Sequence, residues 1–169
     1  MKKVLLVLVA VLCVATVSAK KSFVETITSQ DWTLGLRVGS GFQANTECFY
    51  AADKYVEARF GMGYLIGLTA NFQALHNWNV CNWDWTPSVG KWYLDAGCGI
   101  NLGGAANYAY YGVSGQVKFG IKFDKVPIRL AIDYTPTIGG QTVYGGGLSA
   151  SSFYTYGLGN FGISAVYCF

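Results

Sequence analysis

The sequence predicts an all-β protein, namely an eight-stranded antiparallel up-and-down transmembrane β-barrel preceded by a cleaved signal peptide. Three observations predict this fold. The mean hydropathy is +0.30, yet no apolar run beyond the first residues could cross a bilayer as a helix. Charged residues make up 12% of the chain, against roughly 25% in a soluble domain. From Trp32 onward, apolar and polar residues alternate with the two-residue period of a strand.

The first residues predict secretion. Lys2 and Lys3 precede the unbroken apolar run Val4–Val14, and the small residues Val17-Ser18-Ala19 follow. This order is typical of a secretory signal peptide over residues 1–19, with cleavage after Ala19. We then expect a short periplasmic leader over 20–31 and the outer-membrane barrel over 32–169.

The charge balance of the mature chain argues against a nucleic-acid partner. Without Lys2 and Lys3, ten basic residues stand against nine acidic ones, so the net charge is +1. Nucleic-acid binding domains carry a basic patch or stripe, which this composition does not supply.

Eight alternating segments justify the strand count, an even number as in bacterial outer-membrane barrels. In the first, Trp32, Leu34 and Leu36 lie on one face, whereas Thr33, Gly35 and Arg37 lie on the other. The expected strands are Trp32–Val38, Phe42–Tyr50, Tyr55–Met62, Gly67–Leu75, Lys91–Asn101, Val113–Phe123, Ile128–Thr135 and Asn160–Phe169.

Turns and loops are expected between these segments. Short turns fall at 39–41, Ala51–Lys54 and Asp124–Lys125, and longer connections at Asn77–Gly90, Leu102–Tyr111 and Gly139–Tyr156. Pro136 cannot donate a hydrogen bond to a ladder, so we place it at a rim or a bulge.

The charges sort onto one face, which is the strongest single indication of a barrel. All nine strand charges fall on the polar face: Arg37, Glu47, Glu57, Arg59, Asp95, Lys118, Lys122, Arg129 and Asp133. An eight-stranded lumen is just wide enough to be filled by side chains. An unpaired charge there would be costly, so we expect salt-bridged networks that plug the lumen. The alternative is a narrow polar channel.

Alternation alone does not say which face points outward, because a soluble lipocalin-like barrel has the same period. Lipid outside is favoured because the polar face is rich in Gly, Ser, Thr and Asn, whereas a soluble exterior carries more Lys and Glu. Aromatic residues also recur at strand ends and in the fourth connection, as in the girdles at membrane interfaces. The expected interface aromatics are Trp32, Tyr50, Trp78, Trp83, Trp85, Trp92 and Phe123. The alternative for the Trp78, Trp83 and Trp85 cluster is stacking on sugars.

The last strand ends in Tyr167 and Phe169, and this pattern resembles the C-terminal assembly signal of outer-membrane barrels, with Ser164 where that family usually has Gly. The segments Val126–Pro136 and Gly67–Phe72, and the strand that carries Trp92-Tyr93, resemble small outer-membrane barrel proteins of Bacteroidota. The resemblance implies a fold and an outer-membrane location, but no assigned activity. The partners it implies are outer-membrane lipid and the barrel-assembly machinery.

The sequence offers no catalytic, cofactor or metal site. His76 is the only histidine, and no nucleophile motif accompanies it. His76 and Cys81 alone do not make a ligand set. The four mature cysteines are Cys48, Cys81, Cys98 and Cys168. They allow three full disulfide pairings, among which the sequence does not choose, and thiols that act as small hydrophobes are the simpler expectation.

The sequence is compatible with three hypotheses of function. The first is a structural or interaction barrel whose loops Leu102–Tyr111 and Gly139–Tyr156 face outside and bind an unidentified extracellular ligand. The second is a narrow pore for small solutes. The third is an enzyme acting on lipid, which would need a serine and a histidine at the outer rim, whereas His76 falls at the opposite rim.

Overall fold

The computed structural model describes residues 32–63, 69–145, 148–154 and 156–169. The predicted signal peptide over 1–19 and the leader over 20–31 lie outside the described residues, as do the first two residues of the expected fourth strand. Within the described ranges, no helix is long and apolar enough to cross a membrane.

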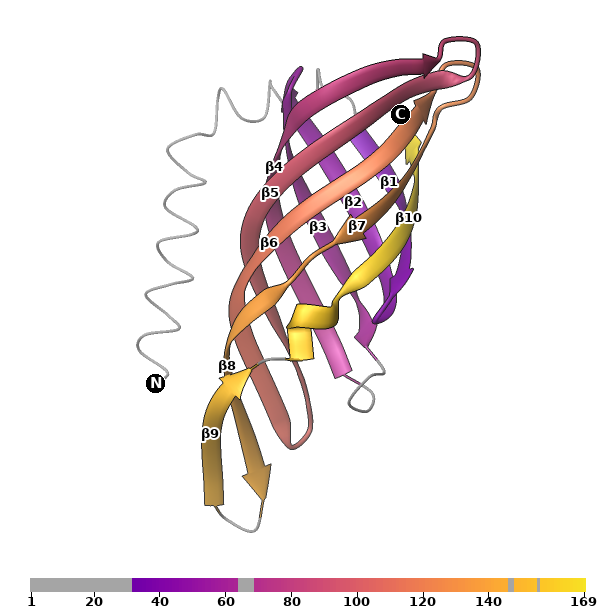
Figure 1. The fold of residues 1–169 in the computed structure, drawn as a ribbon. Helices are drawn as coiled ribbons and strands as arrows, with labels where there is room; N and C mark the ends of the chain where they lie inside the picture. The colour runs from indigo at the N-terminus through magenta and orange to yellow at the C-terminus, as the bar shows by residue number, and fades with distance from the viewer. Residues whose placement is uncertain (1–31, 64–68, 146–147, 155) are drawn as a thin grey trace, which may run out of the picture. The chain divides into compact units, whose positions relative to one another are not determined.

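The described chain is almost entirely β-structure (Figure 1). Its strands are β1 Trp32–Gly39, β2 Gly41–Ala51, β3 Lys54–Gly63, β4 Thr69–Thr86, β5 Gly90–Ala105, β6 Tyr108–Phe123, β7 Ile128–Tyr134, β8 Thr137–Gly145, β9 Leu148–Tyr154 and β10 Phe161–Cys168, and the short 3-10 helix η1 is Tyr156–Gly159.

Eight of these strands form a closed antiparallel ring. The order around it is β1, β2, β3, β4, β5, β6, β7 and β10, and β10 pairs again with β1. Leu36 lies opposite Ala165 across the seam between the first and last strands. The all-β, eight-stranded antiparallel barrel expected from the sequence is therefore confirmed.

The ring has two distinct ends. The termini end carries Trp32, Cys168 and the turns that join β2 to β3, β4 to β5 and β6 to β7. The loop end carries the turns that join β1 to β2 and β5 to β6, together with the hairpin of β8 and β9. In Figure 1 this hairpin reaches beyond the ring, at the end opposite the C-terminus.

Three expected connections are wrong, because strands continue through them. The segment expected as the loop Leu102–Tyr111 is a tight hairpin, in which Ala105 lies opposite Tyr108. The segment expected as the loop Gly139–Tyr156 forms the β8–β9 hairpin, which extends along β6. Asn77–Gly90 is largely strand, because β4 runs to Thr86.

Pro136 lies within the wall, so its expected place at a rim or bulge is also wrong. It stands between β7 and β8, and both strands keep a single register against β6. The Gly115 N–H donates to the Pro136 carbonyl at 3.0 Å. Toward the neighbouring strand β10, the Thr135 N–H donates to Asn160 O at 2.8 Å, just before β10 begins. The ladder therefore lacks only the one donor that proline does not have.

The burial pattern is the reverse of that of a soluble domain. Outward side chains are large and apolar, and Leu36, Phe60 and Ile163 are each more than 60% exposed. Most buried side chains are polar or charged, and Arg37, Glu57, Arg59 and Lys118 are completely buried. A few apolar residues, such as Leu75 and Val166, are buried among them. The two-residue period of each strand therefore sends the apolar face outward.

Closure of the ring predicts a specific cross-link. Thr33 lies opposite Cys168, whose N–H donates to Pro127 O at 2.8 Å instead of to β1. In such a pair the Cα atoms approach to about 4.5 Å, within disulfide range. With Cys48, Cys81 and Cys98 replaced by serine, we expect Thr33→Cys to form a disulfide with Cys168 on oxidation, seen as a faster boiled band without reductant.

The matched control is Leu34→Cys in the same background. Leu34 is the next residue along β1 and faces the other side of the wall, so it should form no bridge. Equal bridging in both variants, or none in Thr33→Cys, would contradict the β1–β10 register.

Candidate functional site

Eight of the nine charges assigned to the lumen meet in one chain of ion pairs inside the barrel. Its order is Arg37, Asp133, Arg59, Glu57, Lys118, Glu47, Arg129 and Asp95, with nitrogen–oxygen distances between 2.6 and 3.4 Å. The sign alternates at every step. Four positive and four negative groups give the chain no net charge.

The network is assembled across the lumen and not along the wall. Its members come from β1, β2, β3, β5, β6 and β7. Lys118 has Asp95 and Asp133 as its neighbours in the ladder, yet its ammonium binds Glu47 and Glu57 from the far side of the barrel. Six of the seven ion pairs therefore tie strands that are not adjacent, and the seventh, Arg59–Glu57, lies within β3.

Lys118 resolves a repulsion that the strand register creates. Glu47 lies directly opposite Glu57 on β2 and β3, and like charges in such a pair destabilise a sheet. The Lys118 ammonium lies between them, 2.7 Å from Glu47 Oε1 and 2.6 Å from Glu57 Oε2. Asn77 Nδ2, from β4, donates to the same Glu57 Oε2 at 3.1 Å.

Toward the loop end, the network finishes in a forked pair. Arg37 donates from Nε and Nη2 to the two Asp133 oxygens at 2.9 and 2.8 Å, the geometry for which a guanidinium is best suited. Its Nη1 donates to Gln43 Oε1 at 2.9 Å. Amides then replace charges, since Gln43 Nε2 donates to Asn71 Oδ1 at 2.6 Å.

The loop end of the lumen is covered by two stacked tyrosines. The rings of Tyr110 and Tyr154 lie 4.6 Å apart and nearly parallel, and both residues are buried. The hollow beneath them measures only about 50 Å³ and has no charged residue in its lining.

Toward the termini end, the network finishes at Arg129 and Asp95. Arg129 Nη1 donates to Glu47 Oε2 at 2.7 Å, and Nη2 donates to Asp95 Oδ2 at 3.3 Å. The guanidinium also lies 4.2 Å from the centre of the Tyr93 ring and 5.0 Å from that of Phe49. These rings and carboxylates fix the Arg129 side chain in place.

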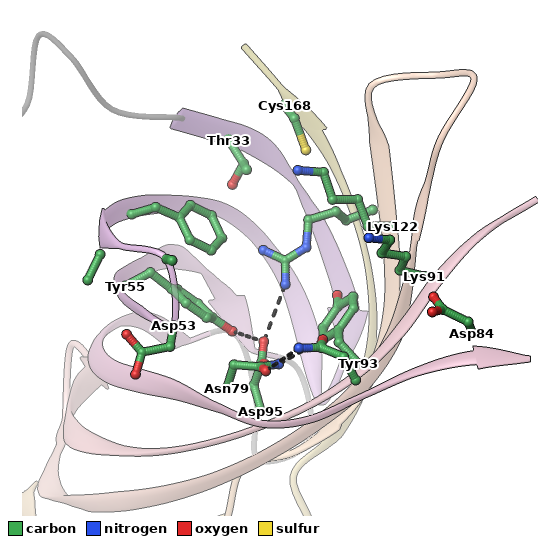
Figure 2. A pocket seen from close by; sticks show the side chains of 15 residues that line it. Thr33, Asp53, Tyr55, Asn79, Asp84, Lys91, Tyr93, Asp95, Lys122 and Cys168 are labelled. Carbon is green, nitrogen blue, oxygen red and sulfur yellow. Dashed lines mark hydrogen bonds and ion pairs between the residues drawn. The ribbon is translucent and has the colours of Figure 1, made fainter. Parts of the chain in front are cut away.

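Beyond Arg129 the lumen opens into a cavity of about 370 Å³, which we call the vestibule (Figure 2). Tyr55 and Asn79 form its floor, and each donates to the Asp95 carboxylate at 2.8 Å. Lys122, the ninth of the expected lumen charges, lines this cavity and takes no part in the ion-pair chain. Lys91, expected only at the edge of a strand, lines it too.

The aromatic residues expected at an interface lie on the outer wall near the termini end. Trp83 and Trp85 stack with ring centres 5.1 Å apart, and Trp92 lies against Phe119 at 5.3 Å. A register shift between Asn79 and Cys81 turns this part of β4 so that Trp83 lies opposite Trp92. Phe119, which the expected set lacks, joins the cluster because it is the outward residue of β6 at that level.

The remaining members of the expected set stand apart from that cluster. Trp32 and Trp78 are both more than one-third exposed, and Phe123 is half-buried. On the same wall, the Tyr50 hydroxyl is hydrogen-bonded to His76 Nε2. His76 therefore faces outward, away from the lumen network.

The cysteines lie on different faces of the wall. Cys48 is opposite Trp32 and Cys168 is opposite Thr33, which places these two on opposite faces. Cys81 and Cys98 are exposed free thiols. Among the described residues, no group of three or more His, Cys, Asp or Glu side chains could hold a metal ion.

The fold and the buried charges together define a closed antiparallel barrel with an apolar outer wall and a charged lumen. No family model matches the sequence, and no curated protein matches it. Among solved structures, the chain is similar to the N-terminal β-barrel domain of Pseudomonas aeruginosa OprF over 83% of this chain and 96% of that one, with 12% sequence identity and a TM-score of 0.46. The closed barrel follows from the strand pairing of this chain alone.

The neutrality of the network predicts a specific pattern of stability. Glu57→Gln leaves one uncompensated positive charge in the interior, which should lower the free energy of unfolding by about 3–5 kcal/mol. Adding Lys118→Gln restores neutrality, so the double variant should be more stable than Glu57→Gln alone. Unfolding in urea from detergent micelles, followed by tryptophan fluorescence, measures both.

The matched control is Asp124→Asn in the exposed turn between β6 and β7. It removes the same charge from a solvated site and should change stability by no more than about 0.5 kcal/mol. If Glu57→Gln cost no more than this control, the interior would be hydrated and the network would not depend on pairing.

Proposed function

We propose that this protein is an outer-membrane barrel whose lumen is plugged by its own side chains and whose loop end presents an interaction surface. The observation that carries the proposal is the inverted burial: apolar side chains cover the outside and charged ones fill the inside. Only a helix or a closed barrel satisfies its backbone in lipid. The proposal assigns no chemical reaction to the protein.

The outer wall supports a lipid environment. Leu36, Phe60, Val113 and Ile163 are each more than 60% exposed and lie on different parts of the ring. Monomeric soluble proteins seldom expose contiguous apolar patches of more than a few hundred Å². The aromatic cluster of Trp83, Trp85, Trp92 and Phe119 supports an interface with head groups at the termini end.

The interior supports a plug better than a pore. Between the vestibule and the loop-end hollow, the eight network side chains are at most 7% exposed. The Tyr110–Tyr154 stack adds a second obstruction. A lipocalin-like function would need an apolar internal cavity, whereas this interior is polar.

The loop end supports an interaction role. Strand β9 pairs with β8 alone among the described strands, so its second edge offers backbone groups to an incoming strand. The sequence carries no charged residue from Tyr134 to Phe169, and an uncharged edge lacks the usual protection against pairing. A partner that adds a strand to β9 is the form of recognition that this surface fits best.

The proposal includes the route to the membrane. Tyr167 and Phe169 are both exposed on the outer wall and pack edge to face at 5.0 Å. We assign to them the assembly signal read by the barrel-assembly machinery, and we assign secretion to the signal peptide over 1–19. The resemblance to small barrels of Bacteroidota belongs to this proposal as well.

Conductance in a planar lipid bilayer tests the plug. The wild-type protein should insert without steady single-channel current, because the network fills the lumen. A variant that replaces Arg37, Glu57, Arg59 and Asp133 with serine, and both Tyr110 and Tyr154 with alanine, removes two charges of each sign together with the tyrosine stack and should conduct. A difference in gel mobility between the unboiled and the boiled sample checks that each protein is folded. Steady current through the wild-type protein would overturn the plug.

A further inference from the structure

Beyond the proposed function, we propose that the vestibule at the termini end is a binding site for a small organic phosphate, held by Lys91 and Lys122. The site lies at the opposite end of the barrel from the β8–β9 hairpin. It does not depend on the loop-end interaction or on whether the lumen conducts.

The strand register places three cations in a row at the mouth of the lumen. Lys91 on β5 lies directly opposite Lys122 on β6, and Lys122 lies directly opposite Arg129 on β7. Like charges in such positions destabilise a sheet. Arg129 has its own carboxylates, Glu47 and Asp95.

The two lysines have no such compensation. Within the described part of the chain, no carboxylate lies within ion-pair distance of Lys91 or Lys122. Figure 2 shows both ammonium groups on one side of the vestibule, with Asp53 on the other side. Asp84 lies on the side of the lysines, but no ion pair joins it to either of them. An anion between the Lys91 and Lys122 ammonium groups would offset their repulsion, as the Lys118 ammonium offsets that between two glutamates.

The size and lining of the vestibule indicate the class of ligand. A volume of about 370 Å³ falls within the roughly 300–1,000 Å³ of small-molecule sites. Lysine binds phosphate as a point charge, and a phosphomonoester carries enough charge to bridge two ammonium groups. Phe49 and Tyr93 supply apolar surface for the organic part of the ligand.

Binding of glycerol 3-phosphate, measured by isothermal titration to the folded barrel in octyl glucoside at constant ionic strength, tests the proposal. The wild-type protein should bind one molecule saturably. Lys91→Gln together with Lys122→Gln removes two charge-assisted hydrogen bonds, so the affinity should fall by about tenfold or more.

The matched control is Lys54→Gln together with Lys125→Gln. These lysines lie at the same end of the barrel but do not line the vestibule, so the net charge falls equally while the site stays intact. The control should keep the wild-type affinity within about twofold, because long-range charge is screened. No saturable binding to the wild-type protein, or equal loss in both double variants, would overturn the site.

The phosphate could come from a soluble compound or from a lipid head group, and a second arm separates these sources. The titration is repeated with the barrel in vesicles of phosphatidylcholine and in vesicles that also contain phosphatidylglycerol. Weaker binding of glycerol 3-phosphate by the wild-type protein in the second set would show that a lipid head group occupies the site. Equal binding in both sets would identify a soluble phosphate as the ligand.

Discussion

The pairing of β1 with β10 is the constraint on which the rest of the structure depends. It leaves the ring without an edge, so every strand in the ring has a neighbour on both sides. A closed ring with a two-residue period has only an inside and an outside, and each side chain must take one of them. Once the apolar face is outside, all polar side chains of the strands are forced into a lumen just wide enough to hold them.

The charge network follows from that confinement. Buried ion pairs add little stability compared with apolar packing, but a buried charge without its partner is strongly destabilising. The chain from Arg37 to Asp95 meets this condition with equal numbers of both signs and strict alternation. Because its links cross the lumen, the network also fixes how far strands slide past one another. Lys118 lies opposite two aspartates in the ladder, but it forms its ion pairs with Glu47 and Glu57. These pairs tie β6 to β2 and β3.

The face of the wall on which each strand residue lies could be predicted from the sequence, because it depends only on counting residues along the strand. Arg37, Glu57 and Arg59 were assigned to the inner face in this way, and the structure buries all three completely. Pairing order could not be predicted, because it depends on the stagger between strands: nothing in the sequence shows that Arg59 Nη1 reaches Asp133 at 3.4 Å.

Strand ends were the least predictable feature. Segments rich in Gly, Asn and Tyr favour loops by composition, yet residues 102–111 continue the ladder, with Gly103 facing Tyr110 across the hairpin. In β4, the shift near Val80 changes which residues face outward, so the outward place of Trp83 could not be obtained by counting from Leu75. The vestibule could not be predicted for a related reason. The sequence alone does not show the strand register that places Lys91 opposite Lys122.

The central claim is that the apolar wall faces lipid, and the most direct test is to place a charge on it. Leu36 lies midway along β1 and is 67% exposed. With Leu36→Arg, the free energy of folding into phosphatidylcholine vesicles should become less favourable by about 2–4 kcal/mol, the cost of arginine at the bilayer midplane. Val126→Arg, in the turn between β6 and β7, makes the same exchange at the rim and should cost about 0–1 kcal/mol. If the two variants folded equally well, Leu36 would face water and the account of a membrane barrel would be contradicted.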